Sequence, residues 1–400
     1  CLHLPDQMAE ATAGRRRLAF DEFFLFSLAV LRQRVARTAR PGIAFQVPGP
    51  LAERAQSLLP FRLTPAQTRA LDSLWNDMAQ PRPMQRLLQG DVGSGKTIVA
   101  FLAAFAAIGN GYQAAIMAPT EILAAQHAER AQDLAGPLGV PVVHLAGSMA
   151  ASRRRRALNL LAETSPCLVV GTHALLQPDV DFGRLGLVVV DEQHRFGVLQ
   201  RAGLQRKGSD PDVLVMTATP IPRSLALVLY GDFDLSVIDE LPPGRLPVTT
   251  EWVEERERVR VEQEVRRRLG QGERAYVVCP VVEESVAELK AAVQTAEAYR
   301  RGPLGEFGVG LVHGRLATAE KAGTIAAFRR GEIRLLVATT VVEVGVDVPE
   351  ATAIVIEDAD RLGLAQLHQL RGRVGRAGRP AVCFVIADRR EIGEEARARL

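Results

Sequence analysis

The chain has 400 residues, of which 47% are hydrophobic and 24% are charged, and this balance excludes disordered, collagen-like and fibrous proteins. Lysine plus arginine (49) barely exceed aspartate plus glutamate (46), so the net charge of +3 does not by itself indicate a nucleic-acid partner. The length predicts two to three domains. The apolar runs are shorter than the roughly 20 residues that cross a bilayer. Four widely spaced cysteines favour reduced thiols in a cytosolic protein.

The first 60 residues differ from the rest of the chain. Leu18 to Val35 is a dense stretch of Leu, Phe and Ala, which favours a helix over a strand. Pro41-Gly42 ends this pattern, and three further prolines between residues 48 and 60 indicate a loop or linker. We therefore predict that residues 1–60 form a helical connector segment that packs in front of a larger body.

Residues 61–241 alternate short apolar runs with longer helical patterns. Continuous apolar runs are typical of parallel strands buried on both faces, and their alternation with helices predicts a doubly wound α/β fold. The predicted strands are Arg86–Gln89, Ala114–Ala118, Val142–Ala146, Cys167–Gly171, Leu185–Asp191 and Val213–Thr217.

The same alternation begins again after the turn-rich break Pro242-Pro243-Gly244. It predicts a second α/β domain over residues 242–400, in tandem with the first. The predicted strands are Val248–Val253, Ala275–Cys279, Gly308–His313, Leu335–Ala338, Ala353–Glu357 and Val382–Ala387.

A complete phosphate-binding pattern, GxxxxGK[ST], follows the first predicted strand. Its residues are Gly90, Asp91, Val92, Gly93, Ser94, Gly95, Lys96 and Thr97. The glycines let backbone N–H groups turn inward around phosphates, and the following helix N-terminus adds positive potential. Lys96 can reach the β and γ phosphates and Thr97 can hold Mg²⁺, so the sequence predicts ATP and Mg²⁺ as cofactors.

An acidic pair ends the strand Leu185–Asp191. Asp191 and Glu192 follow a continuous apolar run, which places them at the carboxyl edge of the sheet, where ligands bind. Asp191 can orient Mg²⁺, and Glu192 can polarise the attacking water. Without the strand and the phosphate loop, a solvated acidic turn would explain them equally well.

These residues resemble the superfamily 2 helicases and translocases over roughly residues 61–388. The resemblance implies two RecA-like domains with ATP between them, and it implies that Arg373 and Arg376 in the segment Gln366–Arg376 act on the γ-phosphate from the second domain. Thr217–Thr219 resembles the motif that links hydrolysis to DNA contacts. Gly345 and Asp347 are implied to line the nucleotide site. Segments implied to contact nucleic acid contain Pro119, Thr120, Gly171, Thr172, His173, Thr339 and Thr340.

Two further site predictions are less specific. Leu59–Gln67 resembles an adenine-recognising motif, in which Gln67 pairs with the adenine edge and Phe61 either stacks on the ring or packs in the core. Arg315 follows a predicted strand and can contact a nucleic-acid phosphate, although a surface turn explains it equally well. Two interpretations also apply to the basic clusters at residues 15–17, 153–156 and 266–268: each can be a solvated helix face or a nucleic-acid-binding surface.

Three longer segments narrow the resemblance: Asp191–Arg201, Thr217–Arg223 and Tyr230–Arg245. They are similar to bacterial double-stranded DNA translocases that remodel stalled forks and Holliday junctions in recombination and repair. The resemblance implies an ATP-hydrolysing helicase motor with double-stranded and branched DNA as partner, monomeric, away from membranes, in the bacterial cytoplasm with the nucleoid. The wedge domain and the extreme C-terminus of those proteins are expected to lie outside this chain.

Three alternatives stay open at this point. Transcription–repair coupling translocases share the first two of these segments. A nucleotide-dependent DNA clamp without motor activity would be expected to have lost Lys96, Glu192 or the arginines of Gln366–Arg376, and the presence of all of them favours the enzyme. An RNA helicase of the same superfamily would share most motifs, and the Tyr230–Arg245 segment argues against it.

Overall fold

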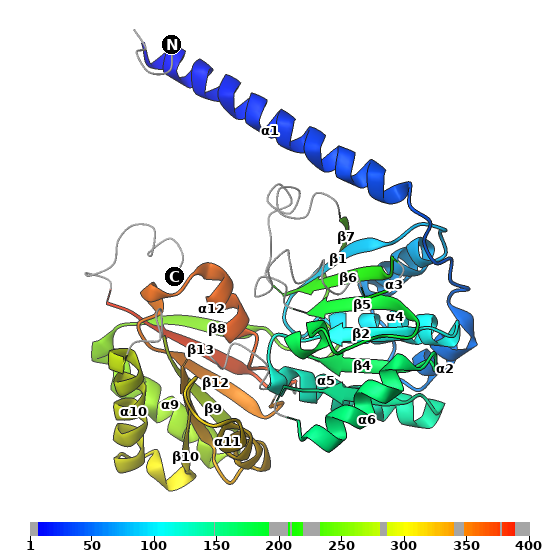
Figure 1. Cartoon of the computed structure of the whole chain (residues 1–400). Helices are drawn as coiled ribbons and strands as arrows, with labels where there is room; N and C mark the ends of the chain where they lie inside the picture. The colour runs from blue at the N-terminus through cyan, green and yellow to red at the C-terminus, as the bar shows by residue number, and fades with distance from the viewer. Residues whose placement is uncertain are drawn as a thin grey trace.

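The structure is a computed structural model that describes residues 7–147, 149–191, 207–208, 210–218, 233–280, 286–339, 348–376 and 378–388. Within these residues the chain forms two parallel sheets with helices on both faces of each (Figure 1). The predicted α/β class with two tandem parallel-sheet units and helices at the N-terminus is confirmed.

The first sheet has seven strands in the order β3-β4-β2-β5-β6-β1-β7, and all its pairs are parallel. Helices α2 to α5 cover one face and α6 covers the other, so the central strands are buried on both sides. Its strands are β1 (Gln85–Gly90), β2 (Gln113–Met117), β3 (Val142–Leu145), β4 (Leu168–Gly171), β5 (Leu185–Asp191), β6 (Asp212–Thr217) and β7 (Asp234–Ile238). The helices are α2 (Gly49–Ser57), α3 (Pro65–Met78), α4 (Lys96–Gly109), α5 (Glu121–Ala135) and α6 (Ala151–Ala162), with short 3₁₀ turns at Gly136–Leu138 and His173–Leu176.

The second sheet has six parallel strands in the order β10-β11-β9-β12-β13-β8. Helices α11 and α12 pack on one face, and α9 and α10 pack on the other. Its strands are β8 (Val248–Val253), β9 (Arg274–Cys279), β10 (Val309–Val312), β11 (Leu335–Thr339), β12 (Ala351–Ile356) and β13 (Ala381–Ile386). The helices are α9 (Arg258–Gly270), α10 (Val286–Arg301), α11 (Thr318–Arg330) and α12 (Leu364–Arg371), with 3₁₀ turns at Glu255–Glu257, Gly305–Phe307 and Ala359–Arg361.

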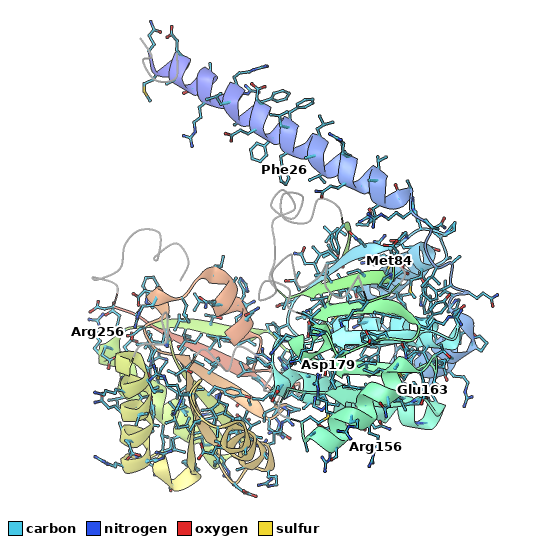
Figure 2. The ribbon with its side chains drawn as sticks, viewed as in Figure 1. Phe26, Met84, Arg156, Glu163, Asp179 and Arg256 are labelled. Atoms are coloured by element: carbon cyan, nitrogen blue, oxygen red, sulfur yellow. The ribbon has the colours of Figure 1, made fainter. Side chains whose placement is uncertain are left out.

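The leading helix departs from its prediction. Helix α1 (Met8–Thr38) is longer than the apolar stretch, and none of its residues is buried, so the expectation that it packs against the body is wrong. Figure 2 shows its side chains, Phe26 among them, standing out from the helix. Its C-terminal end is held by polar contacts, such as the ion pair between Arg34 and Asp234 at 2.5 Å. No helix in the described part of the chain has the length and apolar character to cross a membrane.

Two elements were absent from the prediction. Residues 49–57, expected as a loop, form α2, because Pro50 occupies the first turn of the helix, where its missing N–H costs nothing. Ala52 and Ala55 of this helix are fully buried in the core shared with α4. Strand β7 pairs with β1 and forms the outer edge of the first sheet.

Candidate nucleotide site between the two sheets

The predicted motif segments of the first sheet lie side by side at the carboxyl ends of its strands. Pro119 and Thr120 follow β2, and Gly171 to His173 end the neighbouring strand β4. Moving along the sheet, Asp191 ends β5, Thr217 ends β6 and Gly90 ends β1. The parallel topology therefore places the implied nucleic-acid segments at one end of the edge and the phosphate loop at the other.

The phosphate loop connects β1 to helix α4 and depends on two glycines with positive φ. Gly93 has φ 79° and Gly95 has φ 89°, a backbone region that side chains rarely adopt. A Cβ atom on Gly95 would also lie 2.2 Å from Nε2 of Gln67. The loop therefore needs glycine at position 95 both for its turn and for the close approach of α3.

Lys96 lies inside this loop. Its ammonium group donates hydrogen bonds to the carbonyl oxygens of Gly90 at 2.6 Å and Asp91 at 2.9 Å, and only 8% of the residue is exposed. The loop N–H groups are partly used within the loop, since Ser94 donates to the Asp91 carbonyl at 3.1 Å. The cation is thus held where a phosphate chain in the loop would lie next to it.

Gln67 is held between α3 and the phosphate loop. Its Oε1 accepts from the Thr64 N–H at 2.9 Å, and its Nε2 donates to the Ser94 carbonyl at 2.7 Å. Both ends of the amide are therefore used by the protein, and the residue is 2% exposed. Its pairing with adenine stays a prediction. Phe61 is half exposed and lines the neighbouring cavity, so core packing does not explain it.

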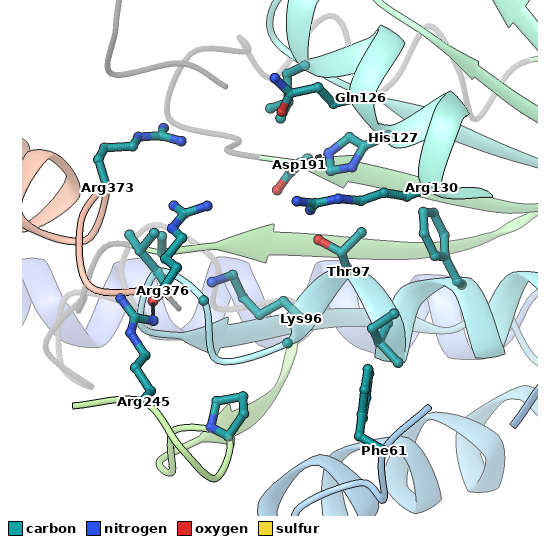
Figure 3. Close-up of a pocket in the computed structure, with 18 of the residues that line it drawn as sticks. Phe61, Lys96, Thr97, Gln126, His127, Arg130, Asp191, Arg245, Arg373 and Arg376 are labelled. Atoms are coloured by element: carbon teal, nitrogen blue, oxygen red, sulfur yellow. Dashed lines mark hydrogen bonds and ion pairs between the residues drawn. The ribbon is translucent and has the colours of Figure 1, made fainter. Parts of the chain in front are cut away.

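A cavity of about 760 Å³ lies between the two sheets, above the phosphate loop (Figure 3). From the first sheet and its helices it is lined by Lys96 and Thr97 of α4, His127 and Arg130 of α5, and Asp191 of β5. Asp191 is 7% exposed, and its Oδ2 lies 2.8 Å from Nε2 of His127. One hydroxyl and one carboxylate thus face the same space.

The second sheet contributes arginines to this cavity. Arg373 and Arg376 lie just after helix α12, and both line the cavity opposite Lys96 (Figure 3). The guanidinium Nε of Arg376 donates to the Gly372 carbonyl at 3.1 Å, which fixes the start of this segment. The two arginines that the sequence assigned to the γ-phosphate therefore share one cavity with the phosphate loop.

Arg245 also enters the cavity, from the linker between the sheets. It donates from Nη1 to the Val92 carbonyl and from Nη2 to the Gly372 carbonyl, the latter at 3.4 Å. Arg245 thus contacts the phosphate loop and the segment after α12 at once. In the sequence, Arg245 stands out only as the last residue of the segment Tyr230–Arg245, because an arginine in a turn after two prolines carries no signal of its own.

The implied nucleic-acid residues differ in exposure. His173 and Arg315 are exposed, and Pro119 and Thr120 are partly exposed. Thr172 and Thr339 are almost fully buried, at 1% and 3%, so their side chains do not reach the surface. The Thr120 hydroxyl caps α5 by accepting from the Leu123 N–H at 3.4 Å. Their nucleic-acid role stays a prediction.

Four predicted site residues lie outside the described residues: Glu192, Thr340, Gly345 and Asp347. Cavity residues that the sequence did not indicate include Gln126, His127, Arg130 and Arg245.

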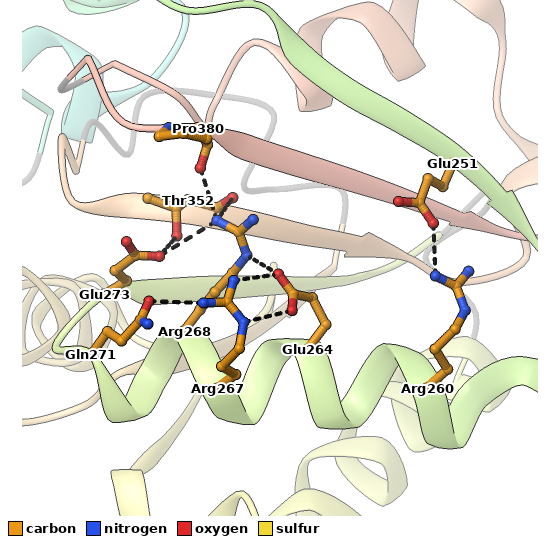
Figure 4. A network of polar contacts seen from close by, with 9 residues as sticks. All are labelled: Glu251, Arg260, Glu264, Arg267, Arg268, Gln271, Glu273, Thr352 and Pro380. Carbon is orange, nitrogen blue, oxygen red and sulfur yellow. Dashed lines mark hydrogen bonds and ion pairs between the residues drawn. The ribbon is translucent and has the colours of Figure 1, made fainter.

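The basic cluster at residues 266–268 is a structural network and not a free basic face (Figure 4). Arg267 and Arg268 both bind Glu264 at 2.8 Å, and Arg268 also donates to the Pro380 carbonyl at 2.8 Å. The hydrogen bond from Arg267, the largest cause, and that from Arg268 lower the pKa of Glu264 to about 2. Arg266 pairs with Glu306 at 2.8 Å, so this cluster joins α9 to its surroundings.

Comparison with known families supports the same assignment. Residues 64–228 match the family model for DEAD/DEAH box helicases, and residues 258–378 match the model for the helicase conserved C-terminal domain. A relative from Synechocystis, named ATP-dependent DNA helicase RecG, is 48% identical over 401 residues, covering 100% of this chain and 48% of the relative. The RecG helicase of Bacillus subtilis is 47% identical over 397 residues, covering 98% of this chain and 58% of the relative. The chain spans about half the length of the curated relatives it matches.

Solved structures show the same relationship. A structure of RecG bound to a three-way DNA junction superposes with a TM-score of 0.82 at 43% identity, over 99% of this chain and 52% of that chain. Yeast Dbp5 bound to RNA and ADP BeF3 has a TM-score of 0.64 at 18% identity, over 88% and 89% of the two chains, and so shares the fold. By motif, sequence and fold, this chain belongs to superfamily 2 of the helicases, among the relatives of RecG.

Proposed function

We propose that this chain is an ATP-hydrolysing motor of a DNA helicase that translocates on double-stranded DNA and remodels branched DNA. One observation carries the proposal: Lys96 and Asp191 from the first sheet and Arg373 and Arg376 from the second line a single cavity. Groups that bind phosphates are divided between two bodies joined by a linker. Hydrolysis in such a cavity depends on how the two bodies are closed, which is the property that a motor needs.

The residues on the first side fit a nucleotide with Mg²⁺. Lys96 and the loop N–H groups suit the phosphates, and the positive φ angles of Gly93 and Gly95 give the loop the turn that brings them together. Thr97 and Asp191 supply the hard oxygen ligands that Mg²⁺ prefers, and Mg²⁺ commonly takes only one or two carboxylates together with phosphates and water. The bound ion would supply positive charge at the phosphate oxygens.

The residues on the second side fit charge stabilisation during hydrolysis. Arg373 and Arg376 are positioned to neutralise charge that develops on the γ-phosphate oxygens. Glu192, which lies outside the described residues, is the proposed group that polarises the attacking water.

Branched double-stranded DNA is the proposed partner. The solved relative was bound to a three-way DNA junction, and the implied nucleic-acid segments after β2 and β4 lie on adjacent strands of one sheet edge. A motor that moves along a duplex should contact its backbone, so binding should fall with salt and depend little on base sequence. We further propose that it works as a monomer with the nucleoid in the bacterial cytoplasm.

The direct test is ATP hydrolysis by this chain with forked DNA, linear duplex, single-stranded DNA and RNA. We expect the largest stimulation with forked or linear duplex DNA and little with RNA. The Lys96→Ala variant should show no turnover with any of them. Nucleotide-dependent DNA binding without stimulated hydrolysis would favour a clamp, and stimulation by RNA alone would refute the DNA motor.

A further inference from the structure

Asp191 has one described side-chain partner, His127 of helix α5. The two side chains are 10% and 3% exposed, and Oδ2 of the carboxylate lies 2.8 Å from Nε2 of the imidazole. A carboxylate oxygen only accepts hydrogen bonds, so Nε2 is the donor in this pair. His127 comes from a helix 64 residues earlier in the chain, and the contact is therefore set by tertiary packing.

Helix α5 places His127 with little freedom. The helix begins at the cap formed by Thr120, and the imidazole ring packs edge-on against Phe101 of α4 with ring centroids 6.5 Å apart. The other ring nitrogen, Nδ1, is buried and has no hydrogen-bond partner among the described residues. The imidazole ring thus packs against Phe101 on one side, and its one described hydrogen bond is donated to Asp191.

In this geometry the two oxygens of the Asp191 carboxylate have different surroundings. The hydrogen bond holds Oδ2 against α5, which fixes the plane of the carboxylate and leaves Oδ1 for the cavity that Lys96 and Thr97 also line (Figure 3). A buried carboxylate without such a donor loses both its orientation and part of the stabilisation of its charge. Partners of this kind orient metal ligands in many proteins.

We propose that His127 is a positioning residue that orients Asp191 for Mg²⁺ at the nucleotide site. This inference rests on the proposed function, because it assumes that Asp191 faces a metal–nucleotide complex. His127 also lines the cavity, and its proposed effect passes through its hydrogen bond to Asp191. Its loss should therefore weaken the contribution of Mg²⁺ to nucleotide binding and leave metal-free binding unchanged.

The test measures binding of a fluorescent ADP analogue to the full chain, with excess Mg²⁺ and with excess EDTA. His127→Leu removes the donor and keeps similar volume, and His127→Gln restores an N–H donor. We expect His127→Leu to raise the Mg²⁺ concentration for half-maximal effect by roughly tenfold or more. Its affinity in EDTA should match that of the wild type, and His127→Gln should recover most of the shift.

A matched control separates this effect from the general cost of losing a histidine. His144 of the edge strand β3 is not among the residues that line the cavity, and His144→Leu should leave the Mg²⁺ dependence unchanged. Wild-type Mg²⁺ dependence in His127→Leu would overturn the proposal. So would equal weakening with and without Mg²⁺ that His127→Gln does not relieve, since that pattern reports packing alone. If the wild-type chain binds no nucleotide, the proposed function fails first, and this inference fails with it.

Discussion

Val92 of the phosphate loop packs so closely against Gly372, which follows helix α12, that a side chain at position 372 has no space. A Cβ atom on Gly372 would lie 2.5 Å from the Cβ of Val92, closer than such atoms approach in proteins. Arg245 bonds to the carbonyl groups of both residues. The phosphate loop itself is therefore one of the places where the two sheet units are in contact.

Gly372→Ala should impair ATP hydrolysis while nucleotide binding persists. The added methyl group must push the segment carrying Arg373 and Arg376 away from the phosphate loop, because Val92 is branched at the clashing atom. Steady-state turnover and binding of a fluorescent nucleotide would be measured side by side. Gly270→Ala is the matched control, since a Cβ there meets nothing within 4 Å. Wild-type turnover in Gly372→Ala would show that this contact is not required for catalysis.

Lys96→Ala should abolish hydrolysis and leave the fold intact. The ammonium group is the cation inside the phosphate loop, and its removal takes away the charge that faces the phosphates. Turnover and thermal unfolding would be compared with those of Lys290→Ala, which removes an exposed lysine from α10. Turnover at the wild-type rate in Lys96→Ala would contradict the assignment of the phosphate site.

Arg373→Ala and Arg376→Ala should each reduce hydrolysis much more than nucleotide binding. An arginine that acts on the transferred phosphoryl group contributes about 10³-fold or more to the rate. The control is Arg256→Ala in the same sheet unit, whose side chain is 75% exposed. Single-turnover rates at saturating ATP would separate catalysis from binding. A loss of affinity with an unchanged rate at saturation would place these arginines in ground-state binding only.

Asp212→Asn should reduce the pH dependence of stability. Burial, the largest cause, raises the pKa of Asp212 to about 8, although the carboxylate accepts from the Met84 N–H at 2.7 Å. The folded chain therefore holds a proton that the unfolded chain, in which the pKa of this carboxyl is about 3.9, has lost. Between these two pKa values stability falls as pH rises, by at most about 1.4 kcal/mol per pH unit.

Urea unfolding midpoints at pH 6 and pH 9 would measure this effect. The wild type should lose stability between the two values, and Asp212→Asn should lose less, because the amide does not titrate. Asp210→Asn, at a partly exposed site two residues earlier, should follow the wild type. Identical pH profiles for the wild type and Asp212→Asn would exclude a raised pKa at this position.

Most of the strands predicted from sequence contain a continuous apolar run, because burial on both faces leaves a strong local signal. Strand β7 was missed because Asp234 and Ser236 interrupt its apolar residues, so this edge strand contains no continuous apolar run. Helix α1 was correctly predicted as helical, but its burial was not. Apolar content indicates that burial of a segment is favourable, but it does not indicate which surface buries it.

The sequence predicted some residues of the candidate site and missed others, and again local pattern made the difference. Some site residues belong to short motifs with recognisable spacing, so they could be predicted from the sequence. The structure places these residues around one cavity: Lys96, Thr97, Asp191, Arg373 and Arg376. His127 and Arg245 have no such spacing. Their contacts with Asp191 and Val92 join residues 64 and 153 positions apart, and only the packed fold brings these together.

The parallel pairing of β7 with β1 determines how mechanical load would enter the first sheet. Gly90 stands opposite Ile238 in the register, so the phosphate loop and the linker to the second sheet leave the same edge side by side. Tension on the linker pulls β7 along its own axis and shears it against β1. The hydrogen bonds along this pair then resist together, which anchors the linker firmly beside the loop that holds Lys96.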